Sequence, residues 1–221
     1  MLRGGGNGSA NTGGASASHQ ALSTPVPSVL ASVVRHCDQP RPVWNGIKRP
    51  FADGPAVDAQ SSGGYVALVS STPRPGLLCM TAVPGSPYVP DGGSYDPFLF
   101  AYPGSDHLTL AGGGFGGSKG AVGFHYGRVG RGVTAVAFIF RNHPAVKAVV
   151  HNGWYLAMWP EEASNMTLTA SARARSFAYG TRPTSVLVTT RSGTITSPLP
   201  NARCSGRRTC GVFDTQHPTT R

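Results

Sequence analysis

The sequence predicts a mainly β protein whose second half is an antiparallel sandwich or barrel-like domain, preceded by one short N-terminal helix and a smaller region that contains a β-hairpin. Two observations predict this class. After residue 120, short runs rich in β-branched and aromatic residues follow one another closely and are separated by turn signals. One segment near the N-terminus has the apolar spacing of an amphipathic helix.

The N-terminal end contains a predicted linker followed by the predicted helix. Residues 1–25 consist largely of Gly, Ser, Ala, Asn and Thr, so we expect a disordered linker with little apolar surface to bury. The helix is expected to begin near Ser28 and to end before Pro40. Its apolar face would consist of Val29, Leu30, Val33, Val34 and Cys37.

Residues 26–111 form the smaller region, which combines the helix with a hairpin and long loops rich in Pro and Gly. The stretch 40–64 is expected to be an extended loop anchored by Trp44 and Phe51. Two strands, at 64–70 and 76–83, are predicted to pair across a short turn. A second loop follows at 84–106, and 107–111 is a candidate strand. The glycine-rich residues 112–120 are predicted to be a hinge between the two halves.

Residues 121–200 form the predicted antiparallel domain. Strands are expected at 121–127, 133–141, 145–151, 154–159, 166–177 and 185–190, with a short return strand after Arg191-Ser-Gly. The run from Val133 to Phe140 is apolar on both faces, which is typical of a central strand that is covered on both sides. The polar and basic residues 201–221 are expected to be a loosely ordered tail.

The segment Ala145 to Pro160 predicts a β-hairpin in which each side chain can be assigned to a face. Asn152-Gly153 suits a two-residue type I′ turn, whose two central residues both need positive φ. Pairing outward from this turn places one set on the face expected to be core: Val146, Ala148, Val150, Tyr155, Ala157 and Trp159. The opposite face is mixed and holds Lys147, Val149, His151, Trp154, Leu156 and Met158.

The net charge of +10 is concentrated in the second half of the chain. Residues 119–221 contain thirteen Lys or Arg and three acidic residues, whereas residues 1–118 contain six of each. A basic half of this kind attracts nucleic acid, anionic lipid or acidic wall polymer. The densest basic cluster on expected strands and turns is Arg128, Arg131, Arg173 and Arg175, and its plainer interpretation is a solvated face.

The four cysteines bear on the compartment of the protein. Cys37, Cys79, Cys204 and Cys210 would form two disulfides in an oxidising compartment. Sequence order favours Cys204–Cys210 and Cys37–Cys79 bridges, although three connectivities exist and Cys37 and Cys79 could be buried free thiols. The sequence has no apolar signal-peptide region and no membrane-spanning run. We therefore expect a cytosolic chain, a chain separated from its signal or anchor, or a misassigned start.

Catalytic and metal-binding motifs are not supported by their context. The GxSxG match at Gly116–Gly120 and the GxGxxG match at Gly112–Gly117 both lack the strand-to-helix setting that their chemistry needs. Cys204, Cys210 and His217 lie outside the spacings of compact zinc sites. The nine acidic residues offer no converging pair for glycoside hydrolysis. We expect no enzymatic activity, no cofactor and no metal.

The candidate binding residues come from the mixed face of the hairpin and from the basic cluster. An exposed Trp154 beside His151 and Lys147 could stack on a sugar or hold an ion, whereas a buried Trp154 would serve packing alone. The full candidate set is Trp154, His151, Lys147, Arg128, Arg131, Arg173 and Arg175.

Two motifs together resemble a known group of proteins. The run Gly127-Arg-Val-Gly-Arg-Gly-Val-Thr-Ala-Val and the hairpin Asn152-Gly-Trp-Tyr, ending in Met158-Trp-Pro, are similar to a segment of uncharacterised exported or membrane-anchored β-rich proteins of actinobacteria. The resemblance includes Gly64-Tyr-Val-Ala-Leu-Val with Cys37 and Cys79, and it covers residues 26–200. It implies an extracytoplasmic β-rich region behind a single-span anchor, which this sequence lacks, and it implies no established activity. Some such proteins are similar to partners of alternative sigma factors, which implies a sensor role.

Our leading hypothesis from the sequence is a non-enzymatic extracytoplasmic binding or sensor domain at the cell envelope. Its basic half would face an anionic polymer, a lipid surface or a protein partner. The alternative is a cytosolic protein that binds nucleic acid non-specifically through the same arginines. That alternative lacks a helix suited to a groove and an RNP-type aromatic strand.

Overall fold

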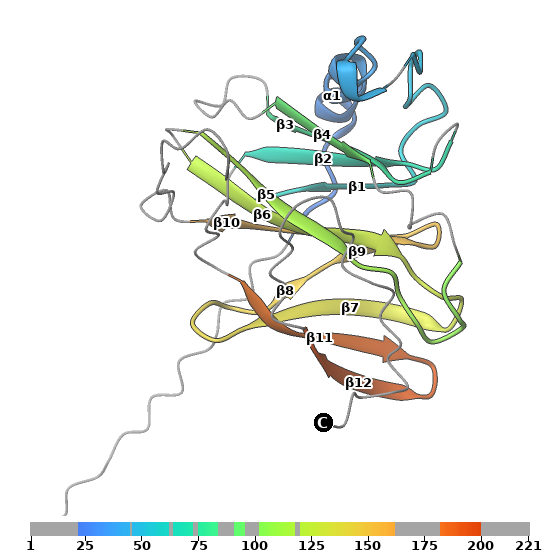
Figure 1. Ribbon diagram of the computed structural model, residues 1–221, viewed down its shortest axis with the longest axis vertical. Coiled ribbons are helices and arrows are strands. Elements are labelled where there is room, and N and C mark those ends of the chain that lie inside the picture. The colour runs from blue at the N-terminus through green and yellow to red at the C-terminus, as the bar shows by residue number, and fades with distance from the viewer. Residues whose placement is uncertain are drawn as a thin grey trace, which may run out of the picture.

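A computed structural model describes residues 22–44, 46–61, 64–72, 75–83, 91–95, 102–117, 120–161 and 182–199 of the 221-residue chain. These residues form a mostly β fold, as the sequence predicts, in which one short helix and three antiparallel sheets are stacked in layers (Figure 1). The elements are α1 (Pro27–Cys37), η1 (Pro42–Trp44), β1 (Val57–Gln60), β2 (Tyr65–Ser70), β3 (Leu77–Ala82), β4 (Asp91–Tyr95), β5 (Ala111–Gly117), β6 (Gly120–Arg128), β7 (Val133–Phe140), β8 (Val146–Lys147), β9 (Val149–His151), β10 (Trp154–Glu161), β11 (Pro183–Thr190) and β12 (Gly193–Pro198).

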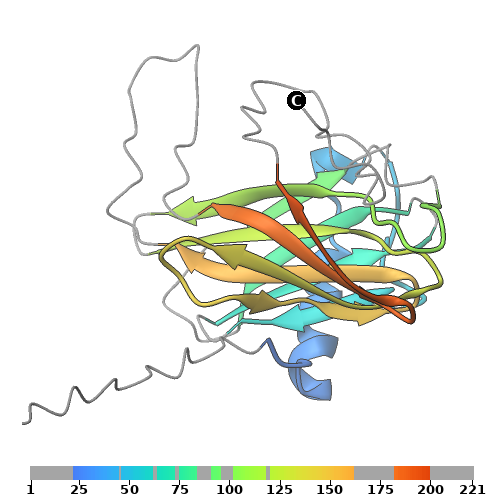
Figure 2. The ribbon, with the colours of Figure 1, turned by 90° about the horizontal axis from the view of Figure 1, so that it is seen from below.

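The three sheets each contain four strands. Their strand orders are β1-β2-β3-β4 for the first sheet, β5-β6-β10-β9 for the second and β12-β11-β7-β8 for the third. In Figure 1 the helix lies at one end of the stack and the third sheet at the other. The view from below in Figure 2 shows the β11–β12 hairpin crossing in front of the other strands. The arrangement is sandwich-like, and the second sheet is its middle layer.

Helix α1 begins and ends close to where the sequence predicts, and it covers the first sheet. Pro27 occupies the first helical turn, where its missing N–H is not needed, and the helix ends at Cys37, before Pro40. Val33 and Cys37 on its apolar face are buried. They pack with Trp44 and Phe51 against side chains of β2 and β3. Trp44 and Phe51 are therefore the anchors that the sequence predicts for this region.

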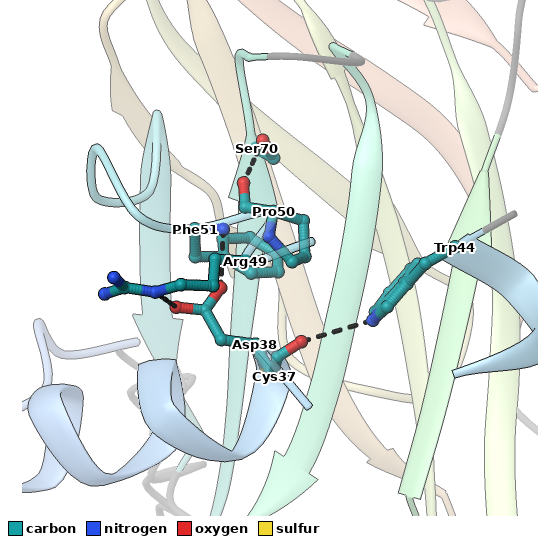
Figure 3. Close-up of polar contacts among 7 residues, drawn as sticks. All are labelled: Cys37, Asp38, Trp44, Arg49, Pro50, Phe51 and Ser70. Atoms are coloured by element: carbon teal, nitrogen blue, oxygen red, sulfur yellow. Dashed lines mark hydrogen bonds and ion pairs between the residues drawn. The ribbon is translucent and has the colours of Figure 1, made fainter. Parts of the chain in front are cut away.

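Covalent and polar contacts fasten the end of α1 to the first sheet. A disulfide joins Cys37 to Cys79 on β3, which confirms this predicted pairing. Trp44 Nε1 donates a hydrogen bond to the Cys37 carbonyl at 3.2 Å. The Asp38 carboxylate accepts the Phe51 N–H at 2.8 Å, and it lies 3.8 Å from the Arg49 guanidinium (Figure 3). These contacts hold the loop after the helix against the sheet.

The first sheet contains the predicted hairpin and two strands that the sequence does not indicate. β2 and β3 pair in register from Tyr65 with Ala82 to Ser70 with Leu77, as predicted. β1 and β4 lie in the stretches 40–64 and 84–106, so the expectation of loops throughout both stretches is wrong. These edge strands contain Asp, Gln or consecutive Gly, which have low β-propensity, and pairing with β2 and β3 determines their conformation.

The glycine-rich segment forms a strand, and the prediction of a hinge at 112–120 is wrong. Residues 111–117 pair with 120–126 along their whole length, as strands β5 and β6. A Cβ atom on Gly112 would lie 2.0 Å from Nδ1 of its partner His125. The absence of a side chain at Gly112 therefore allows a close cross-strand contact, because a larger residue would displace the imidazole.

His125 lies among aromatic rings in the interface between the second and third sheets. Its ring stacks on Phe138 at a centroid distance of 4.8 Å and lies 5.5 Å from Trp159. Its Nδ1 is 3.2 Å from the carbonyl oxygen of Ala111, so the tautomer with a hydrogen on Nδ1 donates there. Burial lowers the pKa of His125 to about 4, and the hydrogen bond to Ala111 opposes this shift only partly.

We expect His125 to make the protein less stable in mild acid. Between its ordinary pKa of 6.5 and its folded pKa of about 4, the unfolded chain binds a proton that the folded chain does not. The free energy of unfolding should therefore fall as pH decreases through this window, by up to about 3 kcal/mol, and this contribution should be constant below it. Urea unfolding across this pH range, compared with His125→Gln, measures the effect. If the free energies of unfolding of the two proteins differ by the same amount at every pH in this range, the expectation is contradicted.

The β9–β10 hairpin has the predicted turn and register. Asn152 and Gly153 have φ angles of 49° and 75°, as a type I′ turn requires. His151 pairs with Trp154, Val150 with Tyr155 and Val149 with Leu156.

Beyond Val149 the predicted hairpin pairing is wrong, because the chain crosses between sheets at Ala148. Val146 and Lys147 pair instead with Phe138 and Ala137 of β7, in the third sheet. The Ala148 N–H donates to the Val136 carbonyl at 2.9 Å. The segment therefore links the middle sheet to the outer sheet.

Both faces of β10 are buried. Tyr155, Ala157 and Trp159 lie on the face predicted to be core, and they pack with side chains of the third sheet. Trp154, Leu156 and Met158 pack against the first sheet. The two halves of the chain thus share one core, which the separate regions expected from the sequence do not anticipate.

The prediction that the run Val133 to Phe140 is covered on both sides is wrong, because Thr134 and Ala135 are exposed.

Some predictions lie outside the described residues. These are most of the linker, the strand at 166–177, the basic tail, Arg173, Arg175, Cys204 and Cys210. The end of the predicted linker is ordered, since Ser23 pairs with Gln60 of β1 and Pro25 is buried. No helix within the described residues combines the length and the apolar character needed to cross a membrane.

Candidate functional site

A surface cleft lies beside the turn of the β9–β10 hairpin. It has a volume of about 420 Å³ and we call it the Tyr102 cleft. Its walls come from the loop before β5, the turn between β6 and β7, and the hairpin turn itself. The lining residues are Tyr102, Val129, Gly130, Arg131, Val133, Val150, His151, Asn152 and Gly153.

The glycines of the run Gly127-Arg-Val-Gly-Arg-Gly allow two segments to meet at this cleft. A Cβ atom on Gly127 would lie 2.1 Å from the Thr109 carbonyl oxygen, and one on Gly130 would lie 2.0 Å from the Gly104 carbonyl oxygen. A Cβ atom on Gly132 would lie 2.2 Å from Oδ1 of Asp106. Any side chain at these positions would push the loop at 104–109 away, so the close contact between the two segments requires glycine here.

Backbone hydrogen bonds fix this loop to the end of β6 and the turn after it. The bonds run from Thr109 N to Arg128 O at 2.9 Å, from Gly130 N to His107 O at 2.8 Å and from Gly132 N to Ser105 O at 2.8 Å. The hairpin turn is attached to the same region through Val129 N and Gly153 O, at 2.9 Å. The cleft is therefore built on a well-supported backbone.

Arg128 contacts two aromatic rings next to the cleft. Its guanidinium carbon is 4.6 Å from the centroid of Tyr102 and 4.7 Å from the centroid of Trp154. Trp154 is 2% exposed, whereas Tyr102 is 63% exposed. The guanidinium thus forms cation–π contacts with both rings. Its buried Nε has no hydrogen-bond acceptor among the described residues.

His151 connects the hairpin to the first sheet at the other side of the cleft. Its Nδ1 lies 3.1 Å from the Ala56 carbonyl oxygen, which can only accept, so Nδ1 carries the hydrogen and Nε2 remains for a ligand. Asp58 on β1 interacts electrostatically with His151. Partial burial raises the pKa of the Asp58 carboxyl, and the charge of His151 counteracts this shift.

The structure brings four of the seven candidate residues together. Arg131 and His151 line the Tyr102 cleft, while Arg128 and Trp154 support the Tyr102 ring. Lys147 is exposed on β8 of the third sheet and does not line the cleft. Arg173 and Arg175 lie outside the described residues.

The structure decides between the two alternatives for Trp154 and adds one residue. Trp154 is buried against the first sheet, which is the packing alternative, so it offers no exposed stacking surface. The exposed ring belongs to Tyr102, which sequence reasoning misses because it lies in a loop without periodicity. The close spacing of glycine and arginine at 127–132 is the signal that points to this place in the fold.

Comparison with protein-family models, curated proteins and solved structures finds no match to this chain. Among the described residues, no group of His, Cys, Asp and Glu is placed to hold a metal ion. The chemistry of the Tyr102 cleft therefore rests on its aromatic ring, its guanidinium, its imidazole and its amide.

Proposed function

We propose that this chain is a non-enzymatic extracytoplasmic binding or sensor domain that recognises an anionic group of the cell envelope at the Tyr102 cleft. The observation that carries the assignment is the guanidinium of Arg131. Arg131 lines the cleft, is exposed and forms no ion pair with an acidic side chain among the described residues, and His151 lines the same cleft. An anion would neutralise this unpaired charge.

The side chains of the cleft favour recognition over catalysis. Its described lining contains no Ser, Thr, Cys, Lys or carboxylate that could act as a nucleophile beside His151. The groups present are hydrogen-bond donors and an aromatic surface, which bind and orient a ligand. Recognition is therefore the function that this set of side chains supports best.

The Cys37–Cys79 disulfide supports the extracytoplasmic part of the assignment. Structural disulfides form and persist mainly in oxidising compartments. The resemblance of the Gly127–Val136 and Asn152–Pro160 segments to exported actinobacterial proteins points to the same location. An envelope location would also expose the basic half of the chain to anionic wall polymers and lipid headgroups.

The binding of three anionic probes tests this function. The full chain is titrated with polygalacturonate, with polyphosphate and with phosphatidylglycerol vesicles, at low and high salt. We expect at least one probe to bind at low salt, and Arg131→Gln to weaken that binding about tenfold or more, as for a lost hydrogen bond to a charged group. Lys147→Gln removes the same charge from an exposed strand outside the cleft and should leave binding unchanged.

Two outcomes would contradict the proposed function. Equal weakening by Arg131→Gln and Lys147→Gln would indicate diffuse charge attraction without a site. Binding restricted to single-stranded or duplex DNA, with a steep dependence on salt, would favour the nucleic-acid alternative.

A further inference from the structure

Tyr102 lines the cleft and is exposed. The Arg128 guanidinium carbon lies over one face of its ring, 4.6 Å from the centroid, while the residue as a whole is 63% exposed, so the ring is both supported and accessible. The hydroxyl end of the ring lies beside the hairpin turn, since a Cβ atom added to Gly153 would lie 3.2 Å from Tyr102 Oη. A supported aromatic face of this kind is suited to stacking against the apolar face of a sugar ring.

Polar residues line the same cleft as this aromatic ring. The Arg131 guanidinium carries a fork of N–H donors that matches the two oxygens of a carboxylate. Nε2 of His151 and the amide of Asn152 can bond hydroxyl groups. The cleft thus offers one stacking surface, one carboxylate fork and two smaller polar groups.

This combination fits a single acidic sugar better than a polyanionic backbone. Nucleic acid and polyphosphate are bound by several cations that follow successive phosphates. The described lining of the cleft contains one arginine, which matches one negative charge. Its volume of about 420 Å³ is in the range of small-molecule sites.

We infer that the Tyr102 cleft binds a uronic acid unit of an acidic polysaccharide, with the sugar ring on Tyr102 and its carboxylate on Arg131. This specificity rests on the proposed function and adds the chemical class of the ligand. Arg128 acts as a positioning residue, because it supports Tyr102 from behind without lining the cleft. Trp154 supports Arg128 in the same way.

Calorimetric titration of the full chain with trigalacturonate tests this inference, with neutral trigalactose as the matched sugar. Trigalacturonate should bind at least about tenfold more tightly than trigalactose, because only the acid can pair with Arg131. Tyr102→Ala should weaken binding of trigalacturonate about tenfold, whereas Tyr102→Phe should retain it because the ring remains. Lys147→Gln should have no effect. Because Tyr102 is highly exposed, both variants should fold normally, and thermal unfolding checks this.

The outcomes separate this inference from the function on which it rests. Equal affinity for the acidic and the neutral sugar, or unchanged affinity in Tyr102→Ala, would overturn the uronic acid assignment. Binding of polyphosphate or anionic vesicles that depends on Arg131, without binding of trigalacturonate, would overturn it while the proposed function stands. Binding of no anionic probe at all would overturn both.

Discussion

Replacing Trp154 with alanine is expected to destabilise the protein by about 3 to 5 kcal/mol, the range for truncating a large core aromatic residue. The indole is 2% exposed and packs in the core that the first and second sheets share. The substitution would leave a cavity between two layers and would remove the ring beneath Arg128. Chemical unfolding followed by far-UV circular dichroism measures the loss as a shift of the midpoint.

Tyr102→Ala is the control for this substitution, because it removes the other aromatic ring that contacts the same guanidinium. Tyr102 is exposed, so its loss should change the free energy of unfolding by less than about 1 kcal/mol. Trp154→Ala should therefore mainly lower stability, whereas Tyr102→Ala should mainly weaken ligand binding. A Trp154→Ala protein with normal stability and no ligand binding would show instead that Trp154 itself contacts the ligand.

Removing the Cys37–Cys79 disulfide, as the Cys37→Ala and Cys79→Ala double variant, is expected to destabilise the protein by about 4 kcal/mol from chain entropy alone. The bridge closes a loop with a sequence separation of 42 and holds α1 against the first sheet. Both residues are fully buried, so the alanines would also leave small cavities. Guanidinium unfolding of the oxidised protein and of the double variant measures this difference.

Reductant provides the internal control for the disulfide. Reduction should lower the unfolding midpoint of the natural protein, and it should have a much smaller effect on the double variant. An unchanged midpoint for the reduced natural protein would mean that packing of α1, without the bridge, holds this layer in place.

Local sequence signals predict the elements that depend on local chemistry. The β9–β10 turn follows from Asn152-Gly153, and α1 follows from Pro27 and its apolar spacing. Strands β1, β4 and β5 are not predicted, because neighbouring strands impose their conformation on residues of low β-propensity. The crossing at Ala148 depends on the β7 partner of Val146 and Lys147, which no local pattern reveals.

The candidate site could be predicted in part. Arg128, Arg131 and His151 are identified from the basic cluster and the hairpin, and the fold brings them to one region. Trp154 is displaced from the site because the first half of the chain packs over its face. Tyr102 could not be identified, because its position depends on the long-range contact between the loop at 104–109 and the glycines at 127–132.

The most direct test of binding at the Tyr102 cleft is chemical-shift mapping of the ¹⁵N-labelled full chain during titration with trigalacturonate. We expect the perturbed amides to concentrate at residues 102–107, 128–133 and 150–153, which form the cleft and its support. Saturating shifts confined to the exposed face of the third sheet or to residues 201–221, with no change around Tyr102, would contradict a binding site at this cleft.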